Sequence, residues 1–551
     1  MKTLKYTFLS LSLCGGILSS CTGFFDTTPY DELSPSTFWK TPDDANDALV
    51  ACYNDWIIGS DILFADCMSD IGYIRSSSGG YRYVGNGSAS QANTVSYYDY
   101  TTIRRCNTFL LNIDKVSFPS EDTKKDLVAQ VRTIRAYRYF LMNFWYGGVP
   151  LILDLPQTAD DAKLPRDTEE NIKSFVYKEL DEAIPDLKTS PAKRGQIARG
   201  AALAIKMRAA LYWGDYQQAL DAATSIRELN LYELDTDFLN IFSIKGQNSR
   251  EIIYAVQYVE NTHKFENAIR LYNNRDGGWA SMVPTENLVN MFEMANGLLP
   301  HEAGSGYDPI HPYAGRDPRL GLTIVYPGQE WLGSDGKKRI VNTLDKVIDG
   351  KNNTDYYLAA DNASRTGLTW AKYTTPRSQY GALNDTGLCP ILFRYAEVLL
   401  TIAEANVELN RNFDEVFNIL DQLRLRGGHI AIDRSRYTTQ SALRELVRRE
   451  RCLELAGEGL RRADIVRWKD EKGKMVAETV LNQTLCRMIG TVDVNESDPT
   501  RRAVITPSTE ANLSLRKIED RVFKPAFRYL PIPQSQHDKN PNLTPTPGYE
   551  K

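Results

Sequence analysis

Apolar residues recur at helical spacing in five stretches of the chain, and the first has a well-marked start. Thr41 can cap a helix, Pro42 suits its first position, and Asp43 and Asp44 complement the positive end of the helix dipole. One face then carries the apolar side chains of Ala45, Ala48, Leu49, Cys52, Tyr53 and Trp56. The other four stretches cover residues 100–145, 171–187, 198–229 and 395–425.

Two of these stretches have the plan of a helix pair. Residues 198–229 carry alanines on both sides of a tight turn at Gly214, and residues 395–425 repeat the plan around residues 410–412. Residues 100–146 give a weaker third case. Two helices packed through alanines across a tight turn are typical of a tetratricopeptide repeat. Because long insertions separate the pairs, we expect them to meet in space as one helical scaffold.

Two insertions lack helical periodicity. Residues 60–99 and about 274–385 are rich in Gly, Asn and Tyr, and the second offers only short strand-like runs such as residues 322–326. Loops of this length are usually functional or disordered. The pattern therefore predicts a mostly α fold, in which a large irregular, loop-rich lobe with few short strands overlies a tetratricopeptide-like helix-pair scaffold.

The N-terminus predicts a lipoprotein signal peptide. Lys2 and Lys5 precede an apolar run, and small residues precede Cys21. The run is too short for a transmembrane helix, which needs about 20 apolar residues. A cysteine in the first position after the cut is typical of a bacterial lipobox, so Cys21 is the predicted lipidation site. An ordinary cleaved signal with an incidental cysteine is the alternative.

This organisation gives one signal peptide and one structural unit. The signal covers residues 1–20 and the unit covers residues 21–551. Within the unit we assign the scaffold mainly to residues 35–60, 100–260 and 390–470, the ligand-binding insertions to about 60–99 and 274–385, and a C-terminal segment to 471–551.

Composition and charge narrow the class of protein. The 551 residues are 42% hydrophobic and 25% charged, as in folded globular proteins. Removing residues 1–20 takes away two lysines and no acid, so the net charge changes from −5 to −7. Nucleic-acid binding selects clustered Lys and Arg, and this acidic balance argues against it.

The sequence offers little for an enzyme or a metal site. The five histidines are dispersed, and there is no H-E-x-x-H, no G-x-S-x-G elbow and no phosphate-binding glycine loop. The cysteines after Cys21 contain no C-x-x-C pair, and buried thiols are the favoured interpretation for Cys52, Cys106 and Cys452. Disulfide pairing stays open. Acidic residues 355–361 match no EF-hand loop, although calcium stays open there too.

Several motifs occur in a fixed order along the chain. They are Phe38-Trp39 with Asp44-Ala45, Tyr146-Gly147-Gly148-Val149-Pro150-Leu151, Arg316-Asp317-Pro318-Arg319-Leu320, Arg394-Tyr395-Ala396-Glu397-Val398-Leu399-Leu400, Glu450-Arg451-Cys452-Leu453-Glu454-Leu455 running on to Arg467-Trp468, and Tyr529-Leu530-Pro531-Ile532-Pro533 with Pro547-Gly548-Tyr549. Together, from Cys21 to Tyr549, they resemble the SusD/RagB outer-membrane nutrient-binding lipoproteins of Bacteroidetes. The ending departs from the family pattern at Pro545-Thr546, and only Asp26 supplies acid close to Cys21.

The resemblance implies a function. A member of this family would be a lipid-anchored protein of the outer membrane, exposed at the cell surface. It would capture an oligosaccharide or polysaccharide and deliver it to a SusC-like TonB-dependent transporter, with no catalysis and no cofactor of its own. The dense mixed charge of residues 449–467 is then structural, and we expect Glu and Arg three or four residues apart to pair along a helix.

Binding residues are expected on the loop-rich insertions, because sugars need flat aromatic surfaces for their C–H faces and polar groups for their edges. The candidate rings are Tyr73, Tyr81, Tyr83, Tyr97 and Tyr98 in the first insertion and Trp279, Trp331 and Tyr380 in the second. The polar candidates are Asp70, Arg377 and Tyr395. Packing of the insertion is the alternative for each ring.

Three rival functions stay open at this point. A RagB-like receptor for peptides would share the scaffold. A glycoside hydrolase needs only two carboxylates at the right separation, which 70 acidic residues cannot exclude by spacing. A structural cap without any ligand is the third.

Overall fold

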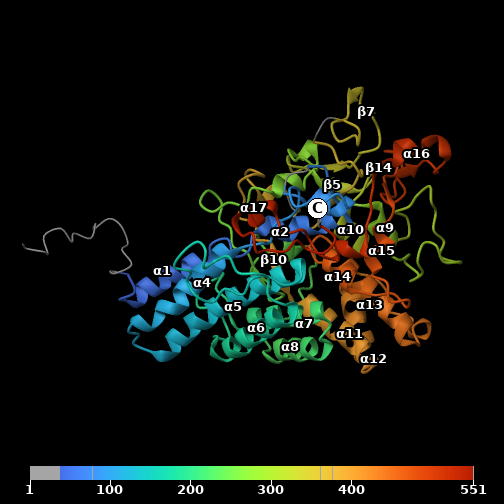
Figure 1. Cartoon of the computed structure of the whole chain (residues 1–551). Helices are drawn as coiled ribbons and strands as arrows, with labels where there is room; N and C mark the ends of the chain where they lie inside the picture. The colour runs from blue at the N-terminus through green and yellow to red at the C-terminus, as the bar shows by residue number, and fades with distance from the viewer. Residues whose placement is uncertain (1–37, 77–78, 360–361, 375–376, 550–551) are drawn as a thin grey trace, which may run out of the picture.

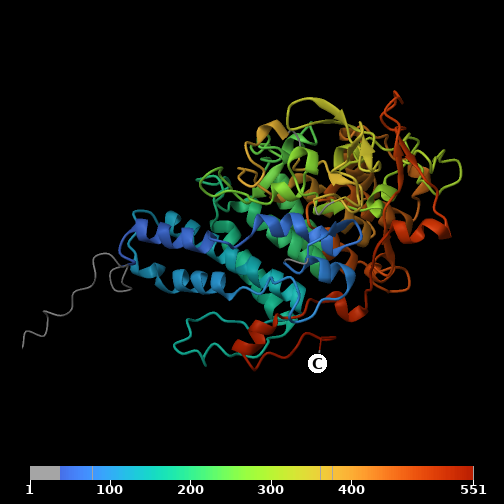
Figure 2. The same cartoon turned by 90° about the horizontal axis from the view of Figure 1, so that it is seen from above.

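The computed structural model describes residues 38–76, 79–359, 362–374 and 377–549, so the predicted signal peptide and Cys21 lie outside the described residues. Helices gather on one side of the molecule, and an irregular lobe with short strands covers the other (Figures 1 and 2). This mostly α architecture confirms the predicted fold class.

The longer helices form the scaffold. They are α1 (Pro42–Tyr53), α4 (Tyr100–Asn112), α5 (Glu121–Tyr146), α6 (Glu169–Ala183), α7 (Arg199–Trp213), α8 (Tyr216–Glu228), α11 (Tyr395–Glu408), α12 (Phe413–Arg426), α13 (Gln440–Leu455) and α14 (Arg461–Arg467). The shorter helices are α2 (Gly59–Phe64), α3 (Tyr81–Asn86), α9 (Glu286–Met291), α10 (Arg319–Thr323), α15 (Val476–Val480), α16 (Glu510–Arg516) and α17 (Gln534–Lys539).

The strands are short and pair two by two, always antiparallel, within the described residues. The pairs are β1 (Gly72–Ile74) with β3 (Met282–Pro284), β2 (Ile252–Ala255) with β10 (Ile391–Arg394), β4 (Ile324–Val325) with β9 (Thr369–Trp370), β5 (Glu330–Leu332) with β6 (Lys338–Ile340), β7 (Val347–Ile348) with β8 (Lys351–Asn352), β11 (Thr484–Cys486) with β14 (Lys517–Asp520), and β12 (Gly490–Val492) with β13 (Ala503–Ile505).

Local sequence explains how the first helix begins and ends. The Thr41 hydroxyl accepts a hydrogen bond from the Asp44 backbone N–H, and the Asp44 carboxylate accepts one from the Thr41 N–H, which is a capping box. The helix ends at Tyr53, earlier than the apolar spacing predicts, because Asn54 is extended and Asp55 has a φ of +57°. Trp56 is buried all the same.

The predicted helix pairs meet as expected. Helix α8 packs against α7 across the turn at Gly214 and also against α11. Gly214 has a φ of +78°, a conformation that favours glycine. The alanines at this packing face are buried, at positions 201, 202, 204, 209, 210, 219, 222 and 223. Pairs far apart in sequence therefore form neighbouring units of one scaffold.

Buried ion pairs join the scaffold to the strands behind it. Arg394 donates to Glu251, Glu454 and Glu458 at 2.6–2.7 Å, and all four side chains are buried. The expected pairing along one helix is limited within residues 449–467 to Asp464 and Arg467. The other pairs of this region cross between elements, because both charged side chains point inward to a shared core.

The two insertions are tied to each other. Strand β1 in the first pairs with β3 in the second, with Gly72 opposite Pro284 and Ile74 opposite Met282. Short helices α2 and α3 stand where the sequence predicted only loop. Among the described residues no helix is long and apolar enough to cross a membrane. Cys52, Cys106 and Cys452 are buried free thiols, as predicted.

Candidate functional site

The main-chain hydrogen bonds of residues 272–281 present one aromatic ring to solvent. The Trp279 N–H donates to the Ile269 carbonyl at 2.7 Å, and the Ala280 N–H donates to the Tyr272 carbonyl at 2.8 Å. Gly278 is required in this loop, since a Cβ there would lie 2.1 Å from the Tyr272 carbonyl oxygen. The Trp279 side chain is left 40% exposed.

An arginine stands over this ring. The Arg270 guanidinium lies 5.4 Å from the centroid of Trp279 and 5.7 Å from that of Phe64, within the range of cation–π contacts. Its Nε donates to the Asn267 side chain at 3.0 Å, and no carboxylate of the described residues pairs with it. Partial burial lowers the pKa of Arg270. Its remaining N–H groups are thus available beside the exposed indole.

A hairpin docks against the same loop. Trp331 on β5 lies opposite Arg339 on β6, and Arg339 pairs with Asp276 of the loop at 2.5 Å. The Ser334 N–H also donates to Asp276, at 3.1 Å. Burial raises the pKa of Asp276, and Arg339 opposes this shift. Trp331 is partly buried beside Val325. We call Asn267, Arg270, Trp279, Trp331 and Arg339 the Trp279 surface.

Two further predicted residues support the loop from behind. Arg377 lies 5.9 Å from the Tyr272 ring centroid and donates to the Tyr380 carbonyl at 2.7 Å. Tyr380 is only 6% exposed and packs edge-on against Tyr272, with burial raising its pKa. The structure therefore brings Trp279, Trp331, Arg377 and Tyr380 together around one loop, with Trp279 outermost.

The predicted tyrosines of the first insertion lie mostly inside. Tyr73, Tyr81 and Tyr97 are buried, while Tyr83 and Tyr98 are partly buried. Their contacts are internal: Tyr81 donates to Asp61 at 2.5 Å, Tyr97 stacks on Trp145 at 5.8 Å, and Tyr98 contacts Tyr100 and Tyr146. In the described conformation these rings pack the insertion onto the scaffold.

The other two polar candidates also lie away from the Trp279 surface. Asp70 is 1% exposed and accepts two hydrogen bonds of 2.9 Å from Arg461, so it serves the buried ion-pair system. Tyr395 begins α11, where its N–H donates to the Glu251 carbonyl, and its ring is half-buried.

Sequence reasoning missed Arg270 and Asn267. They precede Trp279 by nine and twelve residues in a stretch without helical or strand periodicity. Only the backbone bonds that join residues 269–272 to 279–281 bring the guanidinium over the indole. No local pattern in the sequence predicts the contact between Arg270 and Trp279.

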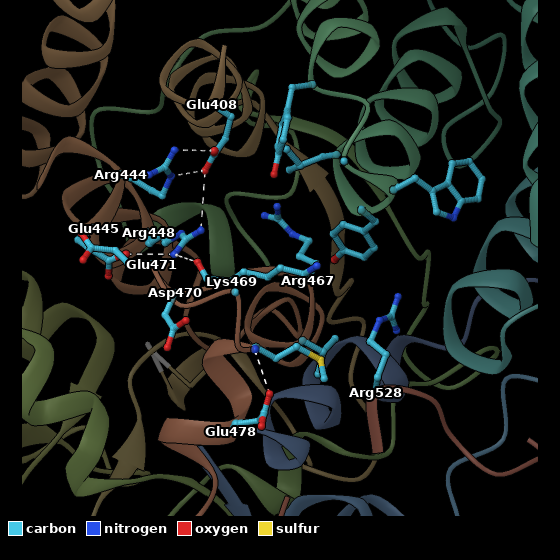
Figure 3. Close-up of a pocket in the computed structure, with 18 of the residues that line it drawn as sticks. Glu408, Arg444, Glu445, Arg448, Arg467, Lys469, Asp470, Glu471, Glu478 and Arg528 are labelled. Atoms are coloured by element: carbon cyan, nitrogen blue, oxygen red, sulfur yellow. Dashed lines mark hydrogen bonds and ion pairs between the residues drawn. The ribbon is translucent and has the colours of Figure 1, made fainter. Parts of the chain in front are cut away.

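A cavity lined by charged residues lies elsewhere, on the scaffold, with a volume of about 810 Å³ (Figure 3). It opens beside the α7–α8 turn, α13 and the segment after α14. Arg444 donates to both oxygens of Glu408 at 2.8 and 3.0 Å, and Arg448 reaches Glu445 at 3.0 Å. Because these charges satisfy one another, we regard the cavity as a polar cleft of the scaffold, not as the ligand site.

Metal chemistry finds no support among the described residues, which contain no group of three or more His, Cys, Asp or Glu placed to hold an ion. Of the acidic run that left calcium open, Asp355 is buried and accepts from the Arg275 N–H at 3.2 Å, and Asp361 lies outside the described residues. Burial raises the pKa of Asp355.

Comparison with known proteins identifies the family of this chain. A sequence model described as the SusD family matches residues 247–549, more than half of the chain. The chain belongs to the SusD family. This confirms the family predicted from the motifs, and the matched span contains the whole of the Trp279 surface and most of the buried ion pairs.

Relatives and solved structures agree with that assignment. SusD-like protein P38 of Formosa agariphila is 26% identical over 496 residues, covering 85% of this chain and 91% of that protein. A SusD-like carbohydrate-binding protein from Bacteroides fragilis superposes with a TM-score of 0.78 at 25% identity, over 92% of this chain and all of that one. A laminarin-binding SusD-like protein shares the fold, with a TM-score of 0.65 at 20% identity over 93% of this chain and all of that one. The descriptions of these two solved structures name carbohydrate binding and laminarin binding, respectively.

Proposed function

We propose that the protein captures glycans outside the cell and delivers them to a TonB-dependent transporter of the outer membrane. The observation that carries the proposal is the exposed Trp279, fixed by its own backbone and flanked by Arg270. An indole face suits the C–H face of a sugar ring, and a guanidinium beside it suits the hydroxyl edge.

The site needs little rearrangement to bind. Backbone hydrogen bonds hold the loop, Asp276 anchors the β5–β6 hairpin, and Tyr272 and Tyr380 fill the space behind. Fewer groups must then be ordered when a ligand arrives, which favours affinity.

The remaining parts of the proposal concern the location and the partner. Lipid attachment at Cys21 would hold the protein on the outer membrane with its lobe exposed. More than one acyl chain is needed for stable anchoring, as the lipobox pattern implies. We assign transporter contact to the helical scaffold, which leaves the Trp279 surface free to meet the ligand. Catalysis would belong to other proteins.

Calorimetry with the purified protein and a panel of neutral and acidic oligosaccharides tests the ligand class. We expect saturable binding to at least one glycan, weakened in Trp279→Ala and unchanged in Leu425→Ala. Leu425 is a matched control because it is an exposed apolar residue, 58% accessible, on scaffold helix α12. Binding of peptides alone would favour the RagB-like rival, and released reducing ends would favour a hydrolase.

Cell fractionation tests the anchor separately. The full chain should appear in the outer-membrane fraction and be accessible to protease added to whole cells. A Cys21→Ala variant should lose that membrane attachment. Recovery of a TonB-dependent transporter with the wild-type chain, by gentle detergent extraction, would support the delivery step, and its absence would contradict it.

A further inference from the structure

A second groove lies between the end of α1 and strand β2, with a volume of about 340 Å³. Its lining residues come from positions 46–57, 193–196 and 254–263, and none of them belongs to the Trp279 surface. This volume is within the range of sites that hold small molecules. The sequence did not single out any of these residues as a binding site.

Aromatic side chains form the walls of the groove, and hydrogen bonds hold the hydroxyls of its tyrosines in place. They are Tyr53, Trp56, Tyr254 and Tyr258. Tyr53 accepts from the Ile197 N–H at 2.7 Å, and Tyr254 donates to the Gly195 carbonyl at 2.9 Å. Trp56 packs edge-on against both of these tyrosines. The walls are therefore rigid before any ligand binds.

One wall continues into a flat platform. The rings of Tyr258 and His263 are stacked at 5.1 Å with an angle of only 7° between their planes. Tyr258 is fixed because its hydroxyl accepts from the Gly59 N–H at 3.0 Å. His263 is exposed, and its side chain forms no hydrogen bond or ion pair with the described residues. The imidazole is thus backed by the Tyr258 ring, and the exposed His263 ring lies at the mouth of the groove.

Polar side chains with unused hydrogen-bonding groups stand at the rim. Asn54 and Asp55 are exposed, and neither side chain bonds to another described residue. Asp55 is held there by a left-handed backbone, with a φ of +57°. Gln257 donates to the Ala255 carbonyl at 2.7 Å, which leaves its own side-chain oxygen open.

We propose that this groove binds a saccharide ring, at a site separate from the Trp279 surface. A pyranose has a flat C–H face that fits an aromatic plane, and hydroxyls around its edge that need both donors and acceptors. The Tyr258–His263 platform supplies the plane, and Asn54, Asp55 and Gln257 supply the edge contacts. An extended peptide, which would pair with the backbone of a strand edge, is the alternative that the titration below separates from a saccharide.

Histidine NMR on the full chain tests this site directly. The chain has five histidines, so imidazoles labelled with ¹³C give few signals, and the His263 signal is the one lost in His263→Gln. The probes are the methyl glycosides of glucose, galactose, mannose and xylose, titrated into the millimolar range where single sugars bind proteins weakly. We expect at least one glycoside to shift the His263 signal saturably and to leave the exposed His301 unshifted.

Rim variants give the second readout. Asn54→Ala removes an edge contact, and Asp55→Asn replaces the charged carboxylate acceptor with a neutral amide; neither touches the walls, and each should weaken the affinity measured at His263, Asn54→Ala at least about threefold. An unshifted His263 with all four glycosides, an equal shift at His301, or a shift caused only by peptides would each overturn the proposal.

The titration at His263 tests the groove independently of the Trp279 surface. Trp279→Ala should leave the titration at His263 unchanged, because the groove shares no residue with that surface. If Trp279→Ala abolishes glycan binding while His263 still responds, both sites stand. If His263 fails to respond while Trp279 is required for binding, only the groove is refuted.

Discussion

Arg394 and Arg467 of the scaffold have different partners from Arg270 and Arg377 of the lobe. In the scaffold, Arg394 and Arg467 meet buried carboxylates at short distances, and each pair joins elements far apart in sequence. On the lobe, Arg270 meets aromatic rings and Arg377 meets backbone carbonyls and a ring, and neither pairs with a carboxylate of the described residues. The first arrangement fixes the fold, and the second keeps cationic groups available next to an exposed indole.

The largest effect should come from breaking the hub of the scaffold. Arg394→Met would leave Glu251, Glu454 and Glu458 buried without their shared cation. We expect the free energy of unfolding to fall by about 3–5 kcal/mol, measured by urea denaturation. Arg250→Met is the control, since its pair with Glu233 is exposed and worth under about 1 kcal/mol. A similar loss of unfolding free energy in both variants would contradict the difference between buried and exposed ion pairs.

Acid should weaken the scaffold through its buried carboxylates. Burial alone would raise the pKa of Glu454, but Arg426 and Arg394 outweigh it and hold that pKa at about 2. Burial of Glu404 is likewise outweighed by Arg467, with a pKa of about 2. Both lie below the ordinary value, so their stabilisation is full above about pH 4.5 and is lost as the pH falls towards 2.

Urea midpoints measured from pH 7 down to pH 3 should therefore decline below about pH 4.5. The decline should be shallower in Glu454→Gln, which cannot be protonated at that position, even though this variant is less stable at pH 7. A midpoint that rises towards pH 3 would contradict the assignment of these carboxylates.

A smaller effect is expected at the Trp279 surface. Trp279→Ala should reduce glycan affinity by about tenfold, equivalent to about 1.4 kcal/mol, because the stacking plane is lost. Since the side chain is 40% exposed and the backbone holds the loop, unfolding should change by no more than about 0.5 kcal/mol. Calorimetry and denaturation on the same preparation separate the two. Loss of stability in place of affinity would show that Trp279 is a packing residue.

The smallest effect is expected from the substitution of a scaffold glycine. Gly214→Ala should cost about 1 kcal/mol of stability, since the φ of +78° strains any side chain although the space around it is open. Glycan affinity should not change. Gly278→Ala offers the contrast, because its Cβ would strike the Tyr272 carbonyl and displace the neighbouring indole. Equal affinities for glycan in these two variants would argue against a preformed loop.

The scaffold was predictable because its signals are local. The cap at Thr41, the glycine at 214 and the alanine periodicity each act within a few residues. Burial of the charges at residues 449–467 was predictable as structure, but their partners were not, since Glu450 meets Arg319 across 131 residues and Arg461 meets Asp70 across 391.

The lobe was predictable only in outline. Composition pointed to aromatic residues in the insertions, yet whether a ring faces outward depends on which backbone segments pair. Tyr97 and Trp279 look alike as aromatic residues in predicted loops, and one stacks on Trp145 inside while the other is exposed. The groove beside α1 could not be predicted, because its walls come from three segments that lie far apart in the sequence.

The loop at residues 272–281 has a consequence for how such a receptor can diversify. Amide and carbonyl groups, which every residue carries, hold the loop in place, so the side chain at position 279 is uncoupled from folding. Under the proposed function, exchanging that one side chain would change which glycans are bound while leaving the frame intact, which makes the position a natural starting point for engineering receptors with altered specificity.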